Sequence, residues 1–177
     1  MKSVLISIQP KWCELIASGR KTVEFRKTKP KLETPFKVYI YCTIDEPLYR
    51  SGEKFWCKNA GEFGNGKVIG EFICDEILSY NETFFDEQEP RDTEIIGEFL
   101  DYSCLKYSEL CAYVGLKDFY GWHISDLVIY DNPRDLSEFE KPHDYLDLSY
   151  SKRNSFFKGI RKGPQSWCYV NSLKENI

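Results

Sequence analysis

The sequence predicts a small α+β protein built on a barrel-like sheet. Several segments alternate apolar and polar residues with the period of a strand, and only a few short segments have helical spacing. Strands interspersed with short helices are typical of this class. With 177 residues, 42% of them hydrophobic and 29% charged, the chain is long enough for one domain with an apolar core.

The N-terminal segments predict a strand, a short helix and two more strands. Residues 3–8 alternate in the manner of a strand with one buried face. Pro10 suits the first position of a helix and Gly19 suits its left-handed end, which predicts a helix over 10–18. Two further strands are predicted at 21–27 and 36–42.

The rest of the chain continues with long strands and short helices. The sequence GKVIGEFICDEIL predicts one strand over 66–78, in which Gly70 is a bulge or a point of close approach. Asp92 and Ser108 are candidate caps of two helices, and Gly115 would end the second. The last strands are predicted at 122–130 and 165–170.

Charge is distributed unevenly along the chain, whose net charge is -4. Residues 1–40 carry nine basic and three acidic side chains, and residues 151–177 carry six basic and one acidic. The segment between them carries nine basic and 24 acidic side chains. If the two ends pack together, they form a positive surface that favours phosphate-bearing ligands. The alternative is that these charges lie on separate faces and are only solvated.

Other patterns limit the classes of function. The sequence has no apolar run near 18 residues, which argues against a membrane span, and its first apolar stretch is short for a signal peptide, so we expect a cytoplasmic protein. The seven cysteines are scattered and form no CxxC pair, which predicts reduced thiols rather than a zinc site. Nucleotide-loop and metalloprotease motifs are also absent, so we expect no metal and no cofactor.

The segment GRKTVEFR fits the pattern GxKxxExR at Gly19, Lys21, Glu24 and Arg26. Together with GKVIGEF, YGWHISDLVIYDNPRDLSEF and PQSWCYV, it resembles the ASCH domain family, a branch of the PUA-like β-barrels, and in particular small phage and bacterial members. The resemblance implies a PUA-like barrel with short helices inserted between strands. It also implies a single domain over 1–177 with insertions at 43–65, 79–103 and 137–160.

The motif residues suggest a charged site on the third predicted element. Glu24 and Arg26 leave one face of a strand about 7 Å apart, where the guanidinium can present a fixed fork to a phosphate or a base edge. Strand alternation places Lys21 on the other face with Val23 and Phe25. Partial burial would lower the pKa of Lys21 and make it a candidate base. The alternative is an ion network that only holds the helix to the barrel.

The resemblance implies RNA binding, so the first hypothesis is a module that binds single-stranded RNA or a modified nucleotide in a charged cleft around the motif. The second is a hydrolase of RNA or of an acylated nucleoside, with Lys21 as base and Glu24 or Glu71 as acid. In family members that hydrolyse N4-acetylcytidine, a Thr follows the motif Lys by three residues, whereas this chain has Glu24 there. The third is a transcription-related protein-interaction domain that uses the acidic middle segment.

Further candidates for ligand contact lie in the second half of the chain. Trp122 and Trp167 could stack on bases, although packing in the core is the default for either ring. His123 could be catalytic or only hydrogen-bonded within its strand. Basic residues interleaved with Phe form either a nucleic-acid-contacting segment or a solvated loop, and they are Lys152, Arg153, Lys158, Arg161 and Lys162.

Overall fold

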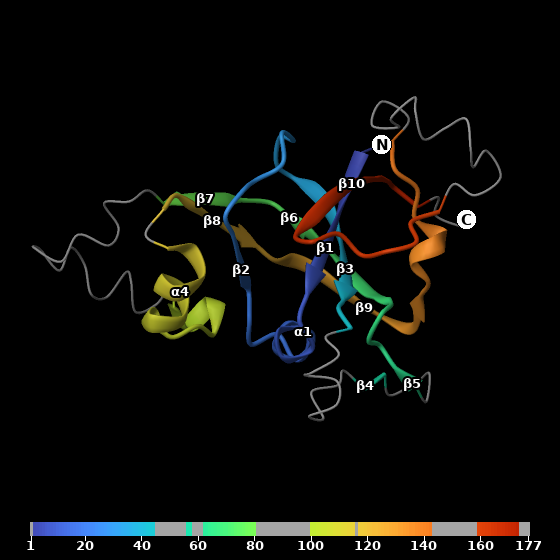
Figure 1. Ribbon diagram of the computed structural model, residues 1–177, viewed down its shortest axis with the longest axis horizontal. Coiled ribbons are helices and arrows are strands. Elements are labelled where there is room, and N and C mark those ends of the chain that lie inside the picture. Colours follow the sequence, from blue (N-terminus) through green and yellow to red (C-terminus); the bar gives the residue numbers. More distant parts are fainter. Residues whose placement is uncertain are drawn as a thin grey trace, which may run out of the picture. The chain divides into compact units, whose positions relative to one another are not determined.

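Figure 1 shows a computed structural model of the chain, which describes residues 2–44, 56–57, 62–80, 100–115, 117–142 and 159–173. In chain order the elements are β1 (Lys2–Ile8), α1 (Pro10–Ala17), β2 (Val23–Arg26), β3 (Phe36–Cys42), β4 (Trp56–Cys57), β5 (Glu62–Phe63), β6 (Val68–Cys74), β7 (Ile77–Tyr80), α4 (Tyr107–Val114), β8 (Phe119–His123), β9 (Ser125–Arg134), the 3-10 helix η2 (Leu136–Glu138) and β10 (Trp167–Asn171).

Contacts within the chain divide it into two compact units, each assembled from separate segments. Unit 1 contains Met1–Cys13, Lys37–Phe72 and Leu127–Ile177. Unit 2 contains Glu14–Phe36 and Ile73–Asp126. The GxKxxExR motif therefore lies entirely in unit 2.

Unit 1 is built on a five-stranded sheet with the strand order β10-β1-β3-β6-β9. β1 pairs with β3 in parallel and with β10 in antiparallel fashion, so that Lys2 lies opposite Asn171. The first and last described strands are thus neighbours, so the two ends of the chain lie together at these strands. A positive surface formed by both ends stays a prediction.

An apolar cluster covers one face of this sheet. Tyr39 and Tyr41 of β3 pack with Leu5 and Val170 against Phe139 beyond η2, and their neighbours Val38, Ile40 and Cys42 are also buried. The predicted close approach at Gly70 is also confirmed. A Cβ atom there would lie 2.4 Å from the carbonyl oxygen of Val128 in β9, so only glycine lets the two strands come this near.

Unit 2 contains a three-stranded sheet with the order β2-β8-β7 and the helix α4. Val23 and Phe25 of β2 pack with Leu110 and Val114 of α4 and with Phe119. Side chains alternate between the faces of a strand, so this packing directs the residues between them, including Glu24, to the opposite face. The helix thus fixes the direction of the motif side chains.

The ends of α4 confirm one prediction and correct another. The helix ends at Gly115, whose φ of +65° is the left-handed cap expected from the sequence. Its first residue is Tyr107, however, and Ser108 is not the cap. Lys106 precedes the helix, and its backbone N–H donates to the Glu109 carboxylate at 2.9 Å. The predicted cap at Asp92 lies outside the described residues.

Two predicted strands are each divided in the structure. The segment 66–78 forms β6 and β7, which belong to different sheets and are separated by Asp75 and Glu76. The segment 122–130 is divided at Ile124 into the end of β8 and the start of β9. β9 also continues through Pro133, and it lies at the edge of the described sheet, where a residue without an N–H is tolerated.

The α+β class is confirmed, because the described residues form two main sheets with a few short helices. Closure of the strands into a barrel stays a prediction. So does the single domain, since large parts of its three expected insertions lie outside the described residues. Six cysteines within the described ranges are free thiols. None of the helices in that part of the chain is long and apolar enough to span a membrane.

Candidate functional site

The motif begins where α1 ends. Gly19 follows the helix with a φ of +72°, and nothing lies within 4 Å of the position that a Cβ atom would take. Glycine is therefore favoured here by backbone conformation and not by lack of space. The chain then reaches Lys21 before β2 starts at Val23.

Glu24 holds the two basic motif residues together. One carboxylate oxygen lies 3.2 Å from Nζ of Lys21 and the other lies 2.9 Å from a terminal nitrogen of Arg26. The Lys21 side chain is 2% exposed, and those of Glu24 and Arg26 are each 9% exposed. The three residues form the buried ion network that the sequence left open as an alternative to an open site.

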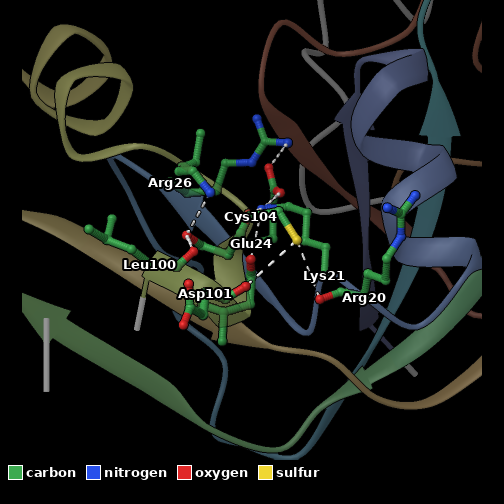
Figure 2. A network of polar contacts seen from close by, with 10 residues as sticks. Arg20, Lys21, Glu24, Arg26, Leu100, Asp101 and Cys104 are labelled. Carbon is green, nitrogen blue, oxygen red and sulfur yellow. Dashed lines mark hydrogen bonds and ion pairs between the residues drawn. The ribbon is translucent and has the colours of Figure 1, made fainter. Parts of the chain in front are cut away.

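The ammonium group of Lys21 has an acceptor for each of its three hydrogens (Figure 2). It donates to the carbonyl oxygens of Val23 and Ser103, both at 2.8 Å, and it faces Glu24. An amine acts as a base through a free lone pair, and here the nitrogen is hydrogen-bonded or ion-paired to three acceptors. This arrangement disfavours Lys21 as a general base.

The same contacts join β2 to the segment 100–104, which contains a helical turn (Figure 2). Besides the bond from Lys21 to Ser103, the backbone N–H of Thr22 donates to the carbonyl of Tyr102 at 2.8 Å. The thiol of Cys104 lies 3.4 Å from the carbonyl oxygen of Arg20. The motif thus fastens two segments of unit 2 that are far apart in the sequence.

Arg26 is the member of the network that lies nearest to solvent-exposed Tyr113. The charge of its guanidinium acts on the Tyr113 hydroxyl of α4. Burial of the hydroxyl raises the pKa of Tyr113, and the positive charge of Arg26 acts in the opposite direction. The Tyr113 side chain is nevertheless 39% exposed, so solvent reaches this end of the network.

The structure places Trp122 and His123 in different surroundings. Trp122 lies opposite Glu24 in the pairing of β2 with β8, is fully buried, and packs edge-on against Phe36 at a ring distance of 5.9 Å. In this arrangement its ring is part of the core and presents no face to a base. His123 is partly exposed, and its Nδ1 lies 2.7 Å from an Asp75 carboxylate oxygen.

Asp75 is the group that orients His123. Its pKa is lowered, chiefly by the hydrogen bond with His123. Next to it, burial raises the pKa of the Cys74 thiol to about 12, so this thiol is protonated and unreactive at neutral pH.

Glu71 belongs to unit 1 and has its own partners. It accepts a hydrogen bond from Lys37 at 2.7 Å and another from the Tyr130 hydroxyl at 2.5 Å. Burial, together with the bond to Glu71, raises the pKa of Tyr130, which is therefore a neutral donor. Arg134 lies over the Tyr130 ring, 5.3 Å from its centre.

The C-terminal candidates are described only in part. Arg161 and Lys162 are exposed, and Trp167 is partly buried at the start of β10, where it packs edge-on against Tyr169. Lys152, Arg153 and Lys158 lie outside the described residues. Ligand contact by all of these residues stays a prediction.

Sequence reasoning missed Asp75, Ser103 and Tyr113. The acidic pair Asp75-Glu76 within an apolar strand pattern was a usable signal, because it marks a place where the strand leaves its sheet. Ser103 takes part through its backbone carbonyl, and no local pattern reveals such a role. Tyr113 reads as one more aromatic residue of an amphipathic helix.

Solved structures share the fold of the chain at low sequence identity. Two point variants of the ASCH protein from Zymomonas mobilis are each 17% identical to this chain, with TM-scores of 0.59 and 0.58. The alignments cover 97% and 96% of this chain and 91% and 88% of the variants. The ASCH structure without a named mutation is 18% identical, with a TM-score of 0.53 and coverage of 96% and 87%. A comparison with curated proteins finds no significant match.

A family model supplies the assignment that these distant structures alone do not. The model of the ASCH domain matches residues 6–116, which include α1, the whole GxKxxExR motif and α4. The match covers more than half of the chain, and it includes the buried network described above. The chain belongs to the ASCH domain family.

Proposed function

We propose that this protein is an RNA-binding module that takes single-stranded RNA or a modified nucleotide at the surface around the GxKxxExR motif. The observation that carries the proposal is the position of the exposed cations. Arg20, Lys27, Lys29 and Lys31 are all exposed on the segment that encloses the buried network. Phosphates are attracted to such a cluster, and RNA recognition in single strands depends on backbone charge and unstacked bases.

The buried network belongs to the same segment as these exposed cations. Two cations, Lys21 and Arg26, share the single carboxylate of Glu24. Among the residues from 20 to 31, Glu24 is the only acidic side chain. Membership of the ASCH family supports the same function through the resemblance described above. A cleft lined by the motif residues themselves stays a prediction, and so does the barrel that would contain it.

The hydrolase hypothesis is less well supported. Lys21 would have to leave its three acceptors before it could take a proton, and Glu24 is held by two cations. Incubation of the protein with N4-acetylcytidine and with labelled RNA tests this alternative. Turnover by the unmodified protein that is lost in Lys21→Ala would favour the enzyme, provided that both proteins show the same thermal unfolding.

Binding is tested by fluorescence anisotropy with a labelled single-stranded oligoribonucleotide over a range of salt concentrations. We expect the logarithm of the affinity to fall linearly with the logarithm of salt concentration, by about 0.7 for each phosphate contact. The double variant Arg20→Glu, Lys31→Glu should weaken binding strongly, whereas Lys11→Glu, an exposed lysine of unit 1, serves as the matched control. Absence of binding at low salt, or equal weakening by the control, would contradict the proposal.

A further inference from the structure

Two lysine–tyrosine pairs lie at the C-terminal end of β2. Nζ of Lys27 is 5.1 Å from the centre of the Tyr113 ring, and Nζ of Lys29 is 5.0 Å from the centre of the Tyr120 ring. Both lysines are exposed. These distances are within the range of cation–π contacts, which at exposed sites are weak enough to be exchanged for another partner.

Arg26 connects the two pairs. Its positive charge opposes the rise in the pKa of the Tyr113 hydroxyl, and it lies opposite Tyr120 in the pairing of β2 with β8. Directly opposite residues share one face of a sheet and lie close together. The buried motif network therefore holds an arginine whose neighbours are two tyrosines, each with an exposed lysine above its ring.

The chemistry of this surface suits a nucleic acid strand. Tyrosine offers a flat apolar ring at low cost in conformational entropy. Every base has a π-face that can stack on such a ring whatever its sequence. A lysine that leaves a ring to contact a phosphate exposes that ring to a base at the same time.

We infer that Lys27, Lys29, Tyr113 and Tyr120 form a stacking surface for single-stranded RNA, on which bases pack against the tyrosines and phosphates meet the lysines. The inference rests on the proposed function, and it states where the RNA binds and that its bases bind by stacking. In this arrangement the buried trio Lys21, Glu24 and Arg26 need not touch RNA.

The test compares tyrosines of one helix. Tyr113→Ala should weaken binding of a single-stranded oligoribonucleotide by about 5- to 150-fold, the range expected for loss of one base–aromatic stack. Tyr107→Ala, on the same helix and 43% exposed against 39% for Tyr113, should change affinity less than twofold. Tyr113→Phe keeps the ring and should keep most of the affinity. An oligomer with abasic positions should bind Tyr113→Ala and the unmodified protein equally.

The lysine contribution has its own matched control. Lys27→Ala should reduce the salt slope by about 0.7 for both normal and abasic oligomers. Lys11→Ala should leave the slope unchanged, although Lys11 also lies over an aromatic ring, that of Trp12 at 4.3 Å. As a readout independent of substitution, photo-crosslinking of 4-thiouridine RNA to the unmodified protein should label the peptide that contains Tyr113.

The outcomes separate the inference from the function on which it rests. Binding by the unmodified protein, with equal effects of Tyr113→Ala and Tyr107→Ala and crosslinks elsewhere, would overturn the stacking surface and leave the RNA-binding proposal intact. Absence of binding by the unmodified protein would overturn both. If Tyr113→Ala fails to fold, two other results test the stacking surface: the change in salt slope caused by Lys27→Ala, and the position of the crosslink in the unmodified protein. An unchanged slope with crosslinks elsewhere would overturn it.

Discussion

Two glutamates of this protein each hold a pair of neighbouring donors, and they differ in how much water reaches them. Glu24 in unit 2 lies between Lys21 and Arg26, all with side chains at most 9% exposed. Glu71 in unit 1 lies between Lys37 and Tyr130, and the exposures of Lys37 and Glu71 are 25% and 21%. Tyr130 also lines a groove of about 570 Å³ along β9, so solvent lies close to the second glutamate.

The comparison shows how burial changes the role of a carboxylate. Glu24 is ion-paired with two buried cations, and removing its charge takes this partner from both in a medium that solvates charge poorly. Glu71 has one cationic partner and one neutral donor, and solvent can replace part of what they provide. We therefore expect the motif network to be a structural requirement, while the contacts of Glu71 tolerate change.

The largest effect is expected for Glu24→Gln. The amide keeps the shape of the side chain but removes the charge that balances Lys21 and Arg26. Breaking a buried ion pair in this way costs about 3–5 kcal/mol of unfolding free energy. Urea denaturation of the two proteins measures the difference. A loss below about 1 kcal/mol would mean that water enters the site freely.

Glu71→Gln should have a smaller effect, of about 1–2 kcal/mol, between the values typical of exposed ion pairs and of hydrogen bonds to charged groups. Tyr130→Phe, which removes only the neutral donor, serves as the companion variant. Both are measured by the same urea denaturation. If Glu71→Gln destabilises the protein as much as Glu24→Gln does, the solvent exposure of the two carboxylates does not determine how much their loss costs.

The smallest effect is expected at the most exposed pair, His123 and Asp75, whose side chains are 41% and 46% exposed. The pKa of Asp75 is lowered below its ordinary value of 3.8, chiefly by His123. A carboxyl group whose pKa is lowered by folding stabilises the folded protein at pH values above its ordinary pKa. This stabilisation is lost as the pH falls through the lowered pKa of the folded state. In His123→Ala the Asp75 pKa should move toward 3.8, as followed by NMR titration of the carboxyl carbon. An unchanged pKa would show that His123 is not its cause.

The sequence predicted the motif strand and its surroundings well, because these depend on local patterns. The alternation of Val23 and Phe25 with Glu24 and Arg26 is the alternation seen in β2, where the apolar pair packs under α4. Lys21 was expected on the apolar face, yet its ammonium reaches Glu24. The reason is that Lys21 precedes the strand, so the two-residue period does not apply to it.

The strand breaks were not predictable from apolar runs alone. β6 and β7 form one continuous apolar pattern in the sequence, but they join different sheets, and only the tertiary structure decides where a strand changes partner. Likewise, burial of the motif charges depends on Ser103, which supplies a carbonyl from a distant segment. For Trp122 the sequence offered base stacking only as an alternative to packing in the core, and its register opposite Glu24 places the ring in the core.

The bond between Lys21 and Ser103 has a consequence for synthesis of the protein on the ribosome. Its two residues are 82 positions apart, and at about 5–20 residues per second the first waits roughly 4–16 s for the second. During that interval the apolar side chains of Val23 and Phe25 have neither α4 nor β8 to cover them. The nascent chain therefore presents an unshielded aggregation-prone segment, which is the kind of surface that chaperones bind during translation.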